Sequence, residues 1–419
     1  MTTEQQASTL FRVTRIFLPF VVGYFLSFAY RTVTAVISPH LTAELGIAAT
    51  ALGVLAAMYF VTFAAFQPVV GVMLDRYGPR RVDSALLLLA AAGAALFALG
   101  ENLEHLAIGR ALVGAGVSAA LMSSLTAIGQ WWPREKLPLV NGLFVASGAL
   151  GAVFATTPVQ ALLTITDWRG VFWGLSVATL AAAALIFATV PERKADPSAP
   201  KVSLKELTGG MARLLVSARF WGLAPTMAFT QSVFMAYISL WAGPWLRDVN
   251  GLSPSEVAAH LQWAALGMVA GYAGFGLMAE TLRRALGVAP LTVSAVGIFC
   301  ALSLQAALVL GAPVPPAVVW TSYAFFAGAP FMGYAILAQQ APPELAGRAN
   351  ASLNLVMFVA SFTVQSAVGA IIDQFPKTAS GYAPQGHATA LGLCLMLEIA
   401  AFAWMLYTQF WRRRAVVPA

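Results

Sequence analysis

The chain has 419 residues, of which 59% are apolar and only 10% are charged, and its mean hydropathy is +0.77. A water-soluble domain carries roughly 25% charged residues, so this composition excludes a soluble protein with a water-facing surface on all sides. The formal net charge is +7, but the basic residues are scattered among short loops, which argues against nucleic acid as a partner. Cys300 and Cys394 both fall within apolar segments, and their spacing indicates neither a disulfide framework nor a metal site.

Twelve apolar segments are long enough to cross a bilayer, which takes about 20 residues in a helix. In chain order they cover 13–39, 49–73, 82–100, 105–130, 139–164, 168–190, 219–246, 255–280, 287–310, 315–340, 348–373 and 387–411. Because backbone groups in lipid must be hydrogen-bonded within the protein, these segments predict an all-α polytopic membrane protein. Residues 1–12 are polar and show no signal-peptide cleavage pattern, so we expect the first span to be retained.

Basic residues are distributed unequally between the two sides of this predicted topology. With an inside N-terminus, 19 of the 24 Lys and Arg residues lie inside, whereas only Arg169, Arg247 and Lys377 lie outside. The positive-inside rule therefore predicts that both termini are cytoplasmic.

Arg31 lies well inside the first span, where an arginine costs about 2.5–3.5 kcal/mol on insertion scales. Tyr24, Ser27, Thr34 and Ser38 fall on the same helical face. A guanidinium flanked by hydroxyl groups can hold a carboxylate or a phosphate in a bidentate grip. The alternatives are that Arg31 snorkels outward or pairs structurally with an acid.

A charged turn with two glycines follows the second span and reads Gly71-Val72-Met73-Leu74-Asp75-Arg76-Tyr77-Gly78-Pro79-Arg80-Arg81. A second turn, Gly276-Leu277-Met278-Ala279-Glu280-Thr281-Leu282-Arg283-Arg284, follows the eighth span. A further pair of segments repeats as well, since Pro133 precedes Asn141 by the same interval as Pro342 precedes Asn350. Repeats at matching places in two halves indicate duplicated helical bundles that move relative to each other. The alternative is a basic loop that only sets topology.

The longest polar stretch separates the spans six and six. We therefore predict an N-terminal bundle at 1–190, a cytoplasmic linker at 191–218 and a C-terminal bundle at 219–419. Within the linker, Lys201 to Arg219 has the spacing of an amphipathic surface helix, and a flexible tether is the alternative.

Other polar residues lie inside the predicted spans. Arg110 stands before Gly114 and Gly116, where packing and snorkelling explain an arginine better than substrate contact does. Candidates to line a cavity are Tyr59, Gln231, Tyr237, Trp241, Tyr323, Asn354 and Gln365. For any one of these residues, hydrogen bonding between helices is an equally good explanation. Glu398 is the acid nearest the middle of a span, which makes it a candidate for proton coupling or a buried structural partner.

At the Asp75 turn the chain resembles the major facilitator superfamily, the twelve-helix secondary transporters. Arg110-Ala111-Leu112-Val113-Gly114-Ala115-Gly116 is similar to the fourth-helix motif of that superfamily. The first helix, with Tyr30-Arg31-Thr32-Val33 and Glu44-Leu45-Gly46, resembles the organic-anion symporter branch, in which a first-helix arginine commonly binds the anionic group. The resemblance implies two pseudo-symmetric six-helix bundles, alternating access and a monomer in a bacterial-type inner membrane. The sequence shows no nucleotide motif and no hydrolase triad, so we expect no enzymatic activity.

The resemblance also implies which residues form a cytoplasmic gate. In the superfamily, the acid of this turn lies near the start of a helix of the opposite bundle, which places Asp75 by the N-terminus of the eleventh span. The gating candidates are Gly71, Asp75, Arg76, Gly78, Arg80, Arg81, Glu135, Glu280 and Arg284.

These features together predict transport of a small organic anion, a carboxylate, with Arg31 as its anchor and no cofactor. Import is preferred from the anion-symporter resemblance alone, and coupling to protons, exchange and downhill transport are alternatives. One alternative is a multidrug efflux carrier, although Ala149 stands where such carriers have the proline of a Gly-Pro pair. An alternative from another class is a non-transporting receptor or assembly factor with a carrier fold.

Overall fold

The computed structural model describes residues 9–133, 137–192, 212–340, 346–378 and 381–411. Nearly all of these residues are helical, and ten of the described helices are long and apolar enough to cross a membrane. The predicted all-α polytopic fold is therefore confirmed.

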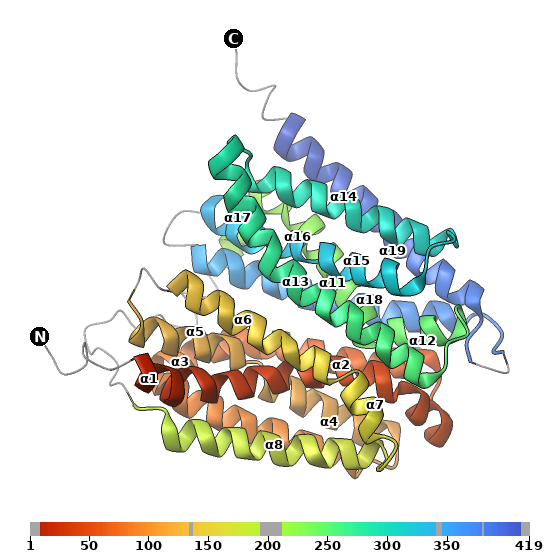
Figure 1. Ribbon diagram of the computed structural model, residues 1–419, viewed down its shortest axis with the longest axis horizontal. Coiled ribbons are helices and arrows are strands. Elements are labelled where there is room, and N and C mark those ends of the chain that lie inside the picture. Colours follow the sequence, from red (N-terminus) through yellow and green to blue (C-terminus); the bar gives the residue numbers. More distant parts are fainter. Residues whose placement is uncertain (1–8, 134–136, 193–211, 341–345, 379–380, 412–419) are drawn as a thin grey trace, which may run out of the picture.

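The first half of the chain forms the lower bundle in Figure 1. Its elements are α1 Thr9–Arg12, the π-helix η2 Val13–Phe17, α2 Leu18–Leu45, α3 Ala49–Ala98, α4 Leu103–Gly116, α5 Ala120–Trp131, α6 Leu137–Phe154, α7 Thr157–Leu162 and α8 Trp168–Thr189. Helix α3 covers the second and third predicted spans, and it bends at Gly78, whose φ is 77°. Glycine adopts this backbone conformation without steric strain, so the charged turn can reverse the chain there.

The second half forms the upper bundle in Figure 1. Its elements are α10 Ala218–Trp221, α11 Ala224–Ala236, the π-helix η4 Tyr237–Trp241, α12 Ala242–Asp248, α13 Pro254–Leu286, α14 Pro290–Val309, α15 Pro316–Phe326, α16 Gly328–Phe331, α17 Gly333–Gln340, α18 Ala346–Ile372, α19 Pro384–Leu406 and the π-helix η6 Tyr407–Trp411. The seventh and tenth predicted spans are thus each built from consecutive short helical pieces. Most of the predicted linker lies outside the described residues, so its boundaries stay a prediction.

The first helix is longer than the sequence predicted. Helix α2 continues through Pro39 to Leu45, whereas the predicted span ended at residue 39. It stops at Gly46, which has a φ of 64° and donates its backbone N–H to the carbonyl of Thr42. A left-handed glycine after the last turn is a common way for a helix to end, and here it determines the boundary more strongly than the proline does.

The two bundles approach each other at one face of the molecule and separate toward the opposite face (Figure 1). We call the first the converged face; it carries residues 46–48, 249–253, 373–378 and 381–383 of the connections between helices. The opposite, divergent face carries α1, the Gly78 bend and the connection 287–289.

Glycines permit backbones of opposite bundles to touch at the converged face. A Cβ atom on Gly369 would lie 2.5 Å from the carbonyl oxygen of Ala49, and one on Gly243 would lie 2.6 Å from that of Ala35. Close approach through small residues is the usual way in which helices associate in lipid.

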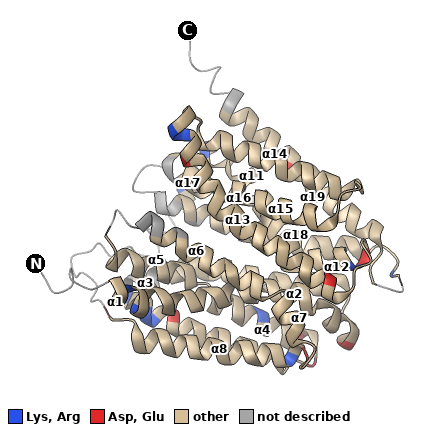
Figure 2. Cartoon of the chain, viewed as in Figure 1, with Lys and Arg blue, Asp and Glu red and all other residues tan. Residues whose placement is uncertain are grey.

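Most charged residues lie toward the two faces, and few lie between them (Figure 2). Basic side chains gather at the divergent face, close to α1 and to the end of α13. This band pattern is expected for a protein that crosses a bilayer, because charges are expensive within the hydrocarbon region.

Candidate functional site

Arg31 of α2 lies at the boundary between the bundles and is only 8% exposed. Its guanidinium carbon lies 4.8 Å from the ring centre of Phe28, 5.7 Å from that of Phe63 and 5.9 Å from that of Phe358. Phe358 belongs to α18 of the other bundle, and it packs on Phe63 with ring centres 4.5 Å apart. The cation therefore faces aromatic rings of both bundles.

The charge of Arg31 has no acidic partner among the described residues. None of the ion pairs in this part of the chain includes it, and its Nε atom is buried without a hydrogen-bond partner. Cation–π contacts offset part of the hydration free energy that the guanidinium loses on burial, but a buried cation is normally paired with an anion. The predicted alternatives of snorkelling and of structural pairing with an acid do not describe this side chain.

Tyrosine side chains lie near the guanidinium. Tyr24 and Tyr59 come from the same bundle, and both lie within electrostatic range of Arg31. Tyr59 donates a hydrogen bond to the carbonyl of Ser27 at 3.2 Å, and its ring centre lies 5.9 Å from the guanidinium carbon of Arg31. These contacts keep the tyrosine ring beside the cation.

The opposite bundle presents two hydrogen-bonded pairs to the same region. Gln231 of α11 donates to the hydroxyl of Tyr272 in α13 at 2.9 Å, and Tyr334 of α17 donates to the amide oxygen of Asn354 in α18 at 2.8 Å. Both tyrosines lie within electrostatic range of Arg31. This wall is polar and uncharged, so it can orient a ligand through hydroxyl and amide groups.

Sequence reasoning missed Tyr272 and Tyr334. Each directly follows a glycine inside an apolar segment, Gly271-Tyr272 and Gly333-Tyr334. Gly271 packs against the backbone of Phe325, and this approach fixes the rotation of α13 that brings the next residue toward α11. A tyrosine beside a glycine in a span was the available signal, although it does not say which way the ring points.

Two of the predicted site residues, Tyr237 and Tyr323, lie within the C-terminal bundle. Tyr237 stacks on Trp320 with ring centres 6.1 Å apart, and Tyr323 donates to the amide oxygen of Gln305 at 3.4 Å. Gln305 in turn donates to Glu398 at 2.7 Å. These two tyrosines therefore lie in the region of the buried Glu398 and are not among the polar groups near Arg31.

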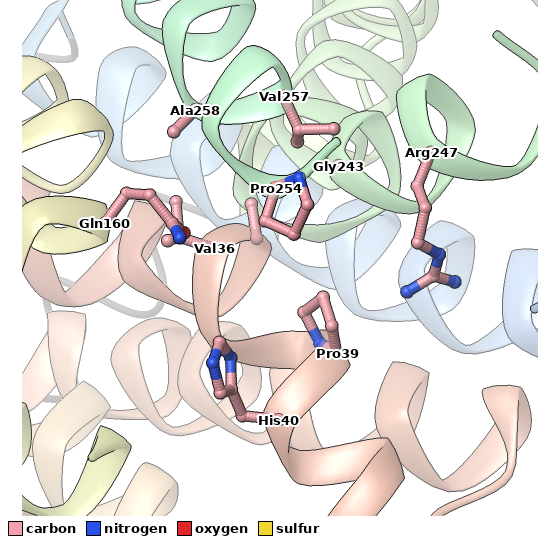
Figure 3. A pocket seen from close by; sticks show the side chains of 10 residues that line it. Val36, Pro39, His40, Gln160, Gly243, Arg247, Pro254, Val257 and Ala258 are labelled. Atoms are coloured by element: carbon pink, nitrogen blue, oxygen red, sulfur yellow. The ribbon is translucent and has the colours of Figure 1, made fainter. Parts of the chain in front are cut away.

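Trp241 and Gln365 lie at the converged face. The indole nitrogen of Trp241 donates to the backbone carbonyl of Gln365 at 3.3 Å, and both residues border Gly53 of α3. A pocket of about 50 Å³ lies along the same face, between Gln160 and Val36 on one side and Pro254 and Val257 on the other (Figure 3). Small-molecule sites usually enclose about 300–1,000 Å³, so this pocket is a packing gap.

Arg110 is fully buried at 1% exposure, which contradicts the predicted snorkelling. Its Nη1 donates to the backbone carbonyl of Tyr30 at 2.8 Å, and its guanidinium carbon lies 5.3 Å from the ring centre of Tyr59. Gly114 packs directly against the Tyr59 backbone, and Gly116 packs against Ala90. The arginine–glycine segment thus packs within the N-terminal bundle, and substrate contact stays without support.

The described gating candidates form contacts within their own bundle. Arg81 pairs with Glu192 at 2.5 Å, and Glu280 pairs with Arg283 at 2.8 Å and Arg284 at 2.5 Å. Arg76 and Arg80 lie over the rings of Tyr77 and Phe187. Gly71 lies within α3, about two turns before the bend at Gly78. Glu135 and the side chain of Asp75 lie outside what the structure describes, so their gating roles stay predictions.

Ten described helices able to cross a membrane, arranged in two bundles, define the class of this protein: a multi-pass membrane protein. The family model of the Major Facilitator Superfamily matches residues 20–365, and the chain belongs to that family. This is a family of transporters, and the chain is not expected to act as an enzyme.

Two curated relatives are described as transporters, and a solved structure shares the fold. A probable sulfoacetate transporter of Cupriavidus necator is 22% identical over 321 residues, which is 72% of this chain and 74% of the relative. The hexuronate transporter of Escherichia coli is 25% identical over 285 residues, which is 64% of this chain and 65% of the relative. A bacterial homologue of the human lysosomal transporter Spinster, solved inward-facing and unoccupied, superposes with a TM-score of 0.75 at 18% identity, covering 99% of this chain and 100% of that one.

Proposed function

We propose that this transporter moves a small organic anion and that Arg31 binds its carboxylate. The observation that carries the proposal is a buried guanidinium at the boundary of the bundles, with no acid beside it among the described residues. A carboxylate can accept two parallel hydrogen bonds from a guanidinium, which restores the pairing that burial removes. Sulfoacetate and hexuronate, the solutes named for the two relatives, are both organic anions.

The uncharged wall supports a ligand with one anionic end and a hydroxylated body. Gln231, Tyr272, Tyr334 and Asn354 supply both donors and acceptors, which suits hydroxyl groups. The second buried cation near Tyr59, Arg110, already donates to the backbone carbonyl of Tyr30, so we assign no second carboxylate to it. Hydroxylated monocarboxylates are therefore the first class to test.

The predicted orientation assigns each face of this conformation to one side of the membrane. The positive-inside prediction puts both termini in the cytoplasm of a bacterial-type inner membrane, so the converged face would be external and this conformation would open to the cytoplasm. Rocking of the two bundles about the Arg31 site would then expose it alternately to each side. Import by a monomer is the proposed mode, on the basis of the anion-symporter resemblance.

Glu398 is the candidate for proton coupling. It is buried in α19, and its described hydrogen-bond partner is Gln305 rather than a basic residue. Because it lies with Tyr323 inside the C-terminal bundle, its coupling to Arg31 would have to pass through movement of α11 and α15. A structural role is the competing proposal, and a proton flux that survives Glu398→Gln would support it.

The test combines ligand-induced thermal stabilisation with uptake into proteoliposomes. The ligands are glucuronate, sulfoacetate, inorganic phosphate, glucose and a lipophilic cation, and the variants are Arg31→Gln, Arg31→Lys and the exposed control Arg219→Gln. A ligand at a hundredfold excess over its dissociation constant stabilises the folded state by about 2.7 kcal/mol.

We expect one anion to stabilise the wild type and the Arg219→Gln control. The Arg31→Gln variant should lose at least about tenfold in apparent affinity, since a hydrogen bond to a charged group contributes about 1.5–3 kcal/mol. The Arg31→Lys variant should recover only part of this loss, because an ammonium cannot match the bidentate geometry. Equal stabilisation of Arg31→Gln by the same anion would refute the anchor, and stabilisation by the cation instead would favour efflux.

A further inference from the structure

Helix α3 begins at the converged face without a capping side chain of its own. Its N-cap is Ala48, and the segment Gly46-Ile47-Ala48 that precedes it offers no side-chain hydroxyl, amide or carboxylate. Alanine is among the poorest N-cap residues, because the first backbone N–H groups of a helix need an acceptor.

The acceptor comes from the other bundle. Asp373, the residue after α18, accepts hydrogen bonds from the backbone N–H of Ala49 at 3.0 Å and of Thr50 at 2.6 Å. Its carboxylate thus lies at the positive end of the α3 dipole, which is a favourable place for an anion. The two segments are more than 300 positions apart in the chain, so their contact depends on how the bundles are arranged.

The backbones of α3 and α18 also touch beside this cap. A Cβ atom on Gly53 would lie 2.7 Å from the carbonyl oxygen of Gln365, and Gly369 lies against Ala49 in the same way. These contacts form one continuous seam, with the Asp373 carboxylate at its end. Separation of the bundles at the converged face must break the seam and both hydrogen bonds together.

Asp248, a buried acid at the same face, is held differently from the half-buried Asp373. It accepts hydrogen bonds from Arg247 at 2.6 and 3.0 Å and from the backbone N–H of Tyr382, and it lies 3.0 Å from Nε2 of His387. Burial alone would raise the pKa of Asp248, but the contacts with His387 and Arg247 outweigh it and hold the pKa below the usual value. All these partners lie in its own bundle, so Asp248 can stay paired whichever face is open.

We propose that Asp373 is a gating residue that holds the converged face closed by capping α3 from the opposite bundle. The hydrogen bonds from Ala49 and Thr50 exist only while that face is packed, so they favour this conformation over the one in which it opens. This inference rests on the proposed alternating-access function.

The same two helices, α3 and α18, have a second acid at the opposite face. The first part of α3 and α18 run in opposite directions across the membrane, and each ends in an acid, Asp75 and Asp373. The resemblance to the superfamily implies that Asp75 lies by the start of α18, at the divergent face. Asp373 would then cap α3 at the converged face, and Asp75 would cap α18 at the divergent face. Opening of one face would break the cap there and allow the cap at the other face to form.

The test is a distance measurement in the absence of any transported solute. Spin labels on Leu103 and Leu310, exposed at the converged face in opposite bundles, report its opening, and labels on Tyr77 and Leu286 report the divergent face. Cys300 and Cys394 are replaced in the background, and the protein is measured in nanodiscs as wild type and as Asp373→Ala.

The controls separate a gate from an ordinary helix cap. Asp167 caps α8 by accepting from Gly170 at 2.8 Å within one bundle, so Asp167→Ala removes a comparable cap without touching the seam. The double variant Ala48→Ser with Asp373→Ala gives α3 a cap of its own, which should restore local helix stability without restoring the contact between bundles.

We expect Asp373→Ala to raise the population with an open converged face, relative to the population with a closed one, at least fivefold. The distance between the labels at the divergent face should become shorter in the same proportion of molecules. Asp167→Ala should leave both distributions unchanged, and the double variant should stay shifted. Unchanged distributions in Asp373→Ala, or full reversal by Ala48→Ser, would overturn the gate. Because no anion is present, such a failure would leave the proposed substrate class intact, and absence of anion transport would not affect the distance result.

Discussion

Glycines bring helix backbones together both inside the bundles and between them, but the two kinds of contact have different consequences. Gly151 of α6 packs against the backbone of Phe25 inside the N-terminal bundle, as Gly369 packs against Ala49 between the bundles. Inside the bundle, side-chain hydrogen bonds reinforce the packing, for example Tyr30 with Thr179 at 2.8 Å. Between the bundles, the tight glycine contacts lie toward the converged face.

This difference shows how one molecule can be both rigid and mobile. A seam that runs the length of two helices with buried hydrogen bonds must unfold to separate, because its polar groups find no water in the lipid. A seam at one face, ending in a carboxylate on a helix N-terminus, can open toward water, where Asp373 and the α3 N–H groups are solvated. Three substitutions can break or sharpen this comparison.

The largest effect is expected from Gly151→Ala inside the bundle. A Cβ atom there would overlap the carbonyl oxygen of Phe25, which cannot rotate away, so we expect destabilisation of about 1–3 kcal/mol from overpacking. Gly174→Ala is the matched control, because nothing lies within 4 Å of its Cβ position. The control should be neutral or slightly stabilising, since alanine favours a helix over glycine by roughly 0.5–1 kcal/mol. Equal thermal midpoints for the two variants would contradict the packing argument.

An intermediate effect is expected from Gly369→Ala between the bundles. Its Cβ atom would lie 2.5 Å from Ala49 O, but the bundles can relieve this overlap by opening the converged face. A penalty of about 1.4 kcal/mol would shift the conformational ratio about tenfold toward the open form. We therefore expect a thermal midpoint close to wild type and a longer distance between labels at Leu103 and Leu310. A large loss of stability without a change in this distance would place Gly369 in a permanent seam.

The smallest effect is expected from Ser253→Ala at the start of α13. Ser253 caps its own helix together with Glu256, in contrast to the α3 start that depends on Asp373. Loss of such a cap costs about 1 kcal/mol, so the thermal midpoint should fall by roughly 2 °C. Uptake and interbundle distances should match the wild type. A shift in the distances would mean that local caps at this face also control the gate.

The apolar spans and the charge bands were readable from the sequence because lipid imposes them on every segment separately. Arg31 was recognisable for the same reason, since an arginine in an apolar span requires an explanation wherever its helix packs. The expectation for Arg110 was wrong about snorkelling, because its position along the span does not reveal that the carbonyl of Tyr30 lies within reach.

Only the tertiary structure decided which polar residues meet. Helical periodicity places Tyr237 and Trp241 on a face of their helix, but packing sets how that face is rotated relative to neighbouring helices. Tyr272 and Tyr334 therefore reach the Arg31 region, whereas Tyr237 and Tyr323 pack toward Glu398. The cap of Asp373 on α3 is a contact of the same kind, because it exists only where two bundles distant in sequence close on each other.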